Sequence, residues 1–142
     1  MSGEKHTSES LSGVWSGRYW YASPDLRIPA TIPFTAFILE RDGGLTGTTL
    51  EPNSFAMNDL HELTAEIEGS READVIDFVK MYDALPGVHQ NPIVYTGSVD
   101  ADRTRIVGGW AIRDDLADDH GGFELSRATS ASFLLLHEAI VT

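Results

Sequence analysis

Hydrophobic and polar residues alternate with a period of two along much of this chain, and turn-forming residues interrupt the alternation at short intervals. A period of two places successive side chains on opposite faces of a β-strand, so the pattern favours strands over helices. The clearest case is HELTAEIEGS, in which Leu63, Ala65 and Ile67 alternate with polar residues. Such a strand has one face toward a core and one toward solvent.

Eight segments alternate in this way or are rich in β-branched and aromatic residues. The predicted strands are Leu11–Tyr21, Phe34–Arg41, Leu45–Leu50, His61–Ser70, Asp74–Asp83, Pro92–Val99, Thr104–Arg113 and Gly122–Ala128. Asp42, Gly43 and Gly44 are predicted to form a hairpin turn, because Asp-Gly tolerates positive φ angles. The loop after Leu50 is expected to begin at Glu51.

These segments predict an all-β, up-and-down antiparallel protein. A sheet of eight strands tends to close, because closure removes edges that invite aggregation, so we expect an eight-stranded β-barrel. The barrel domain is predicted over residues 11–128, after a flexible lead-in at 1–10. Residues 129–142 are expected to form either a short C-terminal helix or a ninth strand.

The formal net charge of -12, from 22 acidic and 10 basic residues, narrows the range of partners. Nucleic acids and anionic membrane surfaces both require clustered Lys or Arg, so neither is expected to bind. The chain has no cysteine, which excludes disulfides, thiolate catalysis and Cys-ligated zinc. It also has no apolar N-terminal segment and no run of roughly 18 apolar residues, so a cytoplasmic protein is expected.

The first predicted strand carries Gly13-Val14-Trp15, which resembles the Gly-x-Trp signature of the calycin superfamily, a group that includes lipocalins, fatty-acid-binding proteins and avidins. In that group the tryptophan closes one end of the barrel, and a basic residue on the last strand packs across it. The resemblance therefore implies a structural plug formed by Gly13, Trp15 and Arg127.

Within that superfamily, FILERDGGLTGT at residues 37–48 is similar to a hairpin of avidin and streptavidin, and IVGGWAI is similar to a later strand of those barrels. Biotin binders carry a polar ligand-contacting residue where this chain has Gly17. Tyr19 and Tyr21 are also much bulkier than their counterparts. The resemblance implies the barrel and does not imply biotin binding.

The side chains expected inside the barrel suggest a candidate pocket. If Trp15 faces inward, a period of two places Gly17, Tyr19 and Tyr21 inside as well. The resemblance to the avidin hairpin adds Thr35, Phe37, Leu39, Leu45, Gly47 and Thr49, and later strands add Phe78, Tyr82, Tyr95, Gly97, Ile106, Gly108 and Trp110. Such an aromatic lining with a few hydroxyls is typical of a pocket for a small hydrophobic molecule. The predicted ligand-binding residues are Tyr19, Tyr21, Thr35, Phe37, Thr49, Tyr82, Tyr95 and Trp110.

The alternative is a barrel filled by its own side chains. The glycines at positions 17, 47, 97 and 108 favour an open interior slightly, because they leave space that aromatic residues line. They can instead allow strands to bend, and the sequence does not separate the two roles.

Two further groups of residues have side chains suited to chemistry. The acidic segment DDLADDH at 114–120 lacks the spacing of a calcium loop and is expected to be solvated, so no metal or other cofactor is predicted. His61, His89, His120 and His137 have the right pKa range for proton transfer but are expected at the surface.

The sequence favours a protein that binds a small hydrophobic or aromatic ligand over an enzyme. The resemblance also allows an isomerase or cyclase, since some small bacterial calycin-like barrels cyclise polyketide-type substrates, and such catalysis needs shape more than a nucleophile. A third alternative is a structural module without a ligand that associates through its C-terminal tail. Association into a homo-oligomer is left open.

Overall fold

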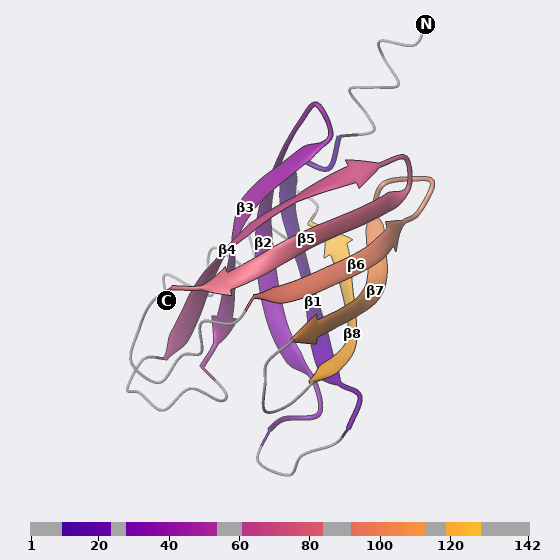
Figure 1. Ribbon diagram of the computed structural model, residues 1–142. Coiled ribbons are helices and arrows are strands. Elements are labelled where there is room, and N and C mark those ends of the chain that lie inside the picture. The colour runs from indigo at the N-terminus through magenta and orange to yellow at the C-terminus, as the bar shows by residue number, and fades with distance from the viewer. Residues whose placement is uncertain (1–9, 24–27, 54–60, 84–91, 113–118, 129–142) are drawn as a thin grey trace, which may run out of the picture.

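The computed structural model of the chain describes residues 10–23, 28–53, 61–83, 92–112 and 119–128. The strands in these ranges are β1 (Gly13–Tyr21), β2 (Ile32–Arg41), β3 (Gly44–Pro52), β4 (Glu62–Glu72), β5 (Val75–Tyr82), β6 (Ile93–Val99), β7 (Arg105–Ile112) and β8 (His120–Arg127). Each strand pairs antiparallel with the next, and β8 pairs with β1 to close the barrel (Figure 1). The predicted eight-stranded antiparallel β-barrel is therefore confirmed.

All eight strands were predicted from the sequence, with different ends. The difference that bears on the site is in β3, which continues through Glu51 and Pro52, where a loop was expected. The predicted lead-in (except Ser10) and the predicted C-terminal tail lie outside the described residues. No helix long and apolar enough to cross a bilayer occurs in the described part of the chain.

The two ends of the barrel differ in how their strands are connected. At one end, here called the turn end, short connections join β2 to β3, β4 to β5 and β6 to β7. At the other, here called the loop end, the longer connections at residues 22–31, 53–61, 83–92 and 113–119 join the remaining strands. Binding sites usually form where long connections lie on a rigid scaffold, so a site is expected near the loop end.

A plug formed by Trp15 and Arg127 closes the turn end. The Trp15 ring is fully buried, and its Nε1 donates a hydrogen bond to the Leu11 carbonyl oxygen at 2.9 Å. The Arg127 guanidinium lies 4.5 Å from the centroid of the Trp15 ring, so the packing implied by the resemblance is present. Arg127 also donates to the carbonyl oxygens of Ser10, Ser12 and Arg103 at 2.8 to 2.9 Å.

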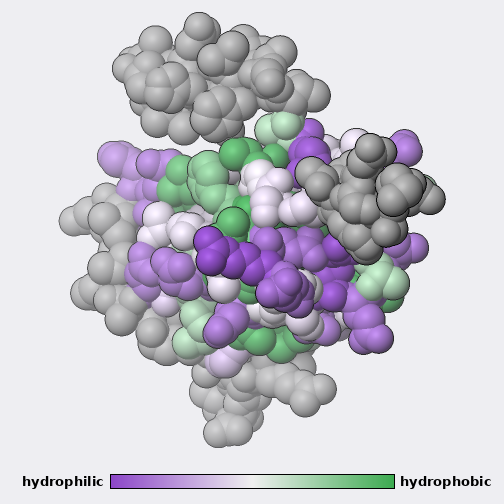
Figure 2. Space-filling view, turned by 90° about the horizontal axis from the view of Figure 1, so that it is seen from above, coloured by the Kyte–Doolittle hydropathy of each residue, from purple (hydrophilic) through white to green (hydrophobic). Residues whose placement is uncertain are grey.

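Gly13 has a φ of 142°, and a Cβ there would lie 3.2 Å from Arg127 Nη1, so a larger residue would crowd the plug. Figure 2, a view from above onto the turn end, shows hydrophilic side chains across the middle of the surface and hydrophobic ones mainly toward its edges.

The register of β2 differs from the one expected. Phe34, Ala36 and Ile38 are buried in the interior, whereas Thr35, Phe37 and Leu39 lie on the outer face. The prediction that these last three residues face inward was therefore wrong.

The cause of this difference is the length of the β2–β3 turn. Arg41 pairs with Gly44, so the turn consists of Asp42 and Gly43, whose φ angles of 52° and 82° are those a tight hairpin requires. The expectation treated Gly44 as a third turn residue. Because side chains alternate along a strand, a shift of one residue moves every side chain of β2 to the opposite face.

Candidate functional site

A cluster of charged and phenolic side chains is buried inside the barrel, near the strand ends at the loop end. Lys80 on β5 lies with its Nζ 2.7 Å from Glu51 Oε1 on β3, and neither side chain is exposed. Tyr82 OH donates to the same Glu51 oxygen at 2.8 Å, and Tyr19 OH donates to Glu51 Oε2 at 2.5 Å. Lys80 Nζ also lies 3.4 Å from Tyr95 OH. We call these five residues the buried polar cluster.

Aromatic rings enclose the Lys80 ammonium. Its Nζ lies 4.7 Å from the ring centroid of Tyr82, 4.8 Å from that of Tyr19 and 5.4 Å from that of Phe34. A cation over a ring face is attracted by the negative face of the π system, most strongly where water is excluded. These rings and the Glu51 carboxylate together replace the water that the ammonium loses on burial.

Burial and the neighbouring charges shift the pKa values of the cluster in one direction. Burial raises the pKa of Tyr19, Tyr82 and Tyr95, and the Glu51 carboxylate raises each further. Burial alone would lower the pKa of Lys80, but Glu51 and Tyr82 act against it and the pKa is raised. At neutral pH the phenols are therefore neutral and Lys80 is an ammonium ion.

These protonation states limit the chemistry of the cluster. An ammonium ion cannot act as an amine nucleophile, and a neutral phenol is a hydrogen-bond donor rather than a base. The Glu51 carboxylate already accepts hydrogen bonds from Tyr19, Lys80 and Tyr82. The cluster therefore fixes the positions of the Lys80 ammonium and the Glu51 carboxylate. It offers no free base in this conformation.

Four of the predicted ligand-binding residues are buried in the described part of the interior. Tyr19, Tyr82, Tyr95 and Trp110 are each at most 5% exposed. Solvent therefore reaches little of these four rings. Tyr95 stacks on Phe78 with the ring centroids 4.8 Å apart. Around these rings the packing is that of the alternative in which side chains fill the barrel.

The glycines of the interior allow neighbouring strands to approach each other closely. A Cβ at Gly17, Gly47 or Gly108 would overlap the carbonyl oxygen of Glu124, Phe37 or Thr96, respectively, on the neighbouring strand. A Cβ at Gly97 would lie 2.7 Å from the Val107 carbonyl oxygen. These positions therefore let the strands coil tightly, which is a common role of glycine in small barrels.

Two other predicted residues, Thr49 and Tyr21, also lie in the interior or at its edge. Thr49 is fully buried, and its hydroxyl has no hydrogen-bond partner among the described residues. Tyr21 is half-buried at the loop end, where its ring meets Trp110 edge to face with the centroids 4.8 Å apart. Trp110 Nε1 donates to the Trp20 carbonyl oxygen at 3.1 Å.

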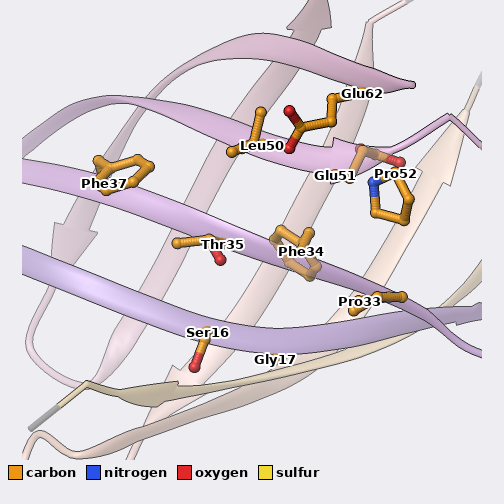
Figure 3. Close-up of a pocket in the computed structure, with 10 residues that line it drawn as sticks. All are labelled: Ser16, Gly17, Pro33, Phe34, Thr35, Phe37, Leu50, Glu51, Pro52 and Glu62. Carbon is orange, nitrogen blue, oxygen red and sulfur yellow. The ribbon is translucent and has the colours of Figure 1, made fainter. Parts of the chain in front are cut away.

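The remaining two predicted ligand-binding residues, Thr35 and Phe37, line a groove on the outer face of the barrel (Figure 3). The groove has a volume of about 310 Å³ and crosses the outer faces of β1 to β4. Its lining consists of Ser16, Gly17, Pro33, Phe34, Thr35, Phe37, Leu50, Glu51, Pro52 and Glu62. The sequence thus identified two residues of the groove while placing them on the wrong face of β2.

Sequence reasoning did not select Glu51 or Lys80, although a signal for each was present. Lys80 lies midway between Phe78 and Tyr82, which were both expected inside, so a period of two also places Lys80 inside. Glu51 lies two residues after Thr49 on the same strand. A charged residue is almost never fully buried unless it is paired, and the pairing partner of each of these residues is not visible in the sequence.

The histidines and the acidic segment contribute no cluster of ligands in the described residues. His61 and His120 are exposed, while His89, His137 and most of the acidic segment lie outside the described ranges. No group of three or more His, Cys, Asp or Glu side chains able to hold a metal ion occurs in the part of the chain that the structure describes.

Comparison of the chain with protein-family models, with curated proteins and with solved structures finds no match.

Proposed function

We propose that this chain is a small-molecule-binding β-barrel protein that holds a hydrophobic or aromatic ligand in the outer groove. The observation that carries the proposal is the groove itself, in which Phe37, Leu50, Pro33 and Pro52 present apolar surface beside the Thr35 hydroxyl. Its volume of about 310 Å³ is at the lower end of the roughly 300–1,000 Å³ typical of small-molecule sites. A compact ligand of one or two fused rings suits this space.

The charged groups of the groove restrict the ligand further. Glu51 and Glu62 are the charged residues in the described lining, and the Glu51 carboxylate is already bonded inside the barrel. Glu62 is exposed and repels an anion. A neutral or cationic ligand is therefore favoured over an anionic one.

The barrel is proposed to be calycin-like, and the packing of Arg127 across Trp15 supports this assignment. Proteins of that group hold ligands inside the barrel. Here the interior is filled by Tyr19, Tyr95 and Phe78, so the groove is the better-supported site.

A barrel enzyme of the isomerase or cyclase type has less support. Such an enzyme would hold its substrate against preorganised hydrogen-bond donors, and Lys80 and Tyr95 are groups of that kind. Both side chains are buried, at 0% and 1% exposure, so a substrate does not reach them in this conformation.

Binding of the neutral fluorophore N-phenylnaphthylamine tests the proposal. We expect saturable enhancement of its emission by the protein and about a tenfold weaker affinity in Phe37→Ala, which corresponds to about 1.4 kcal/mol. Leu39→Ala is the matched control, because Leu39 is 47% exposed on the same face of β2 and does not line the groove. Absence of saturable binding, or equal weakening in both variants, contradicts the proposal.

A further inference from the structure

The outer face of β5, β6 and β7 carries most of the large hydrophobic side chains that the described barrel leaves exposed. These are Val75, Val79 and Met81 on β5, Val94 on β6 and Val107 on β7, each between 37% and 54% exposed. The three strands lie side by side across the front of the barrel in Figure 1. We call the outward-facing residues of these strands the β5–β7 face.

The β5–β7 face combines a ridge with a recess. Val79 and Met81 form the ridge on β5, while the small residues Gly109 and Ala111 lie on β7. A recess of about 570 Å³ lies beside them, lined by Val94, Thr96, Gly109, Trp110 and Ala111. A surface with both a ridge and a recess can be complementary to itself under a two-fold rotation.

The β5–β7 face carries less net charge than the rest of the barrel surface. The chain as a whole carries -12, so most surfaces of two copies repel one another. The outward-facing charges of the β5–β7 face are one acidic residue, Asp77, and one basic residue, Arg105, which also pairs with Glu124 on β8 at 2.9 Å. By contrast, the outer face of β4 carries Glu62, Glu66 and Glu68. A basic partner would be drawn to β4, whereas a face with little charge suits a second copy of itself.

We propose that the β5–β7 face binds the same face of a second copy of this chain in a two-fold symmetric dimer. Val79, Val94 and Ala111 form one row across the three strands, since Val94 pairs with both of the others. A two-fold axis along β6 places Val79 of each copy opposite Ala111 of the other. The ridge of each copy then enters the recess of its partner.

The area of the β5–β7 face indicates how tightly two copies associate. Three strands about 4.8 Å apart and about seven residues long, at about 3.3 Å per residue, cover roughly 330 Å² in projection. Stable interfaces bury about 800 Å² on each partner, and smaller ones are typical of transient association. The dimer is therefore weak and forms in a concentration-dependent manner.

Sedimentation equilibrium of the full chain tests the proposal over about 10 µM to about 1 mM, the range in which a small interface associates. The average mass rises from 15.5 kDa toward twice that value. Val94→Asp and Val79→Asp each weaken dimerisation at least tenfold.

Leu39→Asp is the matched control, because it adds the same charge at a side chain that is 47% exposed on β2, against 43% for Val94. This variant dimerises like the original chain if the β5–β7 face is the interface. Circular dichroism spectra establish that each variant remains folded. A monomer at every concentration overturns the proposal, as does a dimer that Val94→Asp and Val79→Asp leave intact.

Discussion

Lys80 and Glu51 form an ion pair across β4, with Nζ 2.7 Å from Oε1 and neither side chain exposed to solvent. Removing two charges from water costs several kcal/mol for each ion, and their mutual attraction offsets this cost only when the geometry is good and further hydrogen bonds are made. Tyr19 and Tyr82 supply such bonds to Glu51. The hydrogen bonds to Glu51 and the aromatic rings around the Lys80 ammonium therefore offset part of the cost of burying the pair.

Removing one partner of this pair should be strongly destabilising. We expect Lys80→Met to lower the free energy of unfolding by about 3–5 kcal/mol, because Glu51 is left as a buried charge without its counterion. Urea denaturation measures the change. Adding Glu51→Leu to Lys80→Met should recover part of the loss, because the second substitution removes the uncompensated carboxylate.

An exposed ion pair provides the control for this experiment. Arg18 Nε lies 2.9 Å from Glu124 Oε1, and the Arg18 side chain is 55% exposed. Arg18→Met should cost less than about 1 kcal/mol, because solvent screens the pair. Losses of similar size in Lys80→Met and Arg18→Met would contradict the assigned role of the buried pair.

The stability of the barrel should fall as the pH rises above about 10. The pKa values of Tyr19, Tyr82 and Tyr95 are raised from 10.0 in the folded chain, so the folded state keeps protons that the unfolded state releases. The raised pKa of Lys80 acts in the same direction. The contribution of these groups to the free energy of unfolding is fully present when the pH is below the pKa values that they have in the unfolded chain. It is lost as the pH rises above those values.

Urea denaturation at a series of pH values between neutrality and strong alkali measures this dependence. Tyr82→Phe removes one of the titrating phenols, so its stability should fall less steeply with pH than that of the original chain. A stability that stays constant or increases above pH 10 would show that the phenols are not held in their neutral form.

Gly17 should not tolerate a side chain. A Cβ there would overlap the carbonyl oxygen of Glu124 on β8, so Gly17→Ala must push β1 and β8 apart. We expect a loss of about 1–3 kcal/mol in the free energy of unfolding, the usual cost of overpacking. In Gly44→Ala the new Cβ would lie 3.3 Å from the Arg41 carbonyl oxygen, so a smaller loss is expected. Thermal denaturation of both variants compares them, and an unchanged midpoint in Gly17→Ala would contradict this reading of the glycine.

The strands and their order were predictable because neighbouring residues in the sequence specify them. The alternation of Leu63, Ala65 and Ile67 specifies a strand with one buried face, and Asp42-Gly43 specifies a hairpin. The face of β2 was harder to predict, because one residue more or less in the turn reverses it. Only the observed pairing of Arg41 with Gly44 decides that Phe37 is outside and Phe34 inside.

The groove and the buried polar cluster depend on contacts between residues far apart in the chain. Lys80 and Glu51 are 29 positions apart, on strands separated by β4. The period of two places each of them inside the barrel, but nothing local shows that the two meet at the same depth. The alternation and turn residues of the sequence by themselves determined an eight-stranded barrel. Closure and register, which are properties of the whole sheet, decided which side chains share its interior.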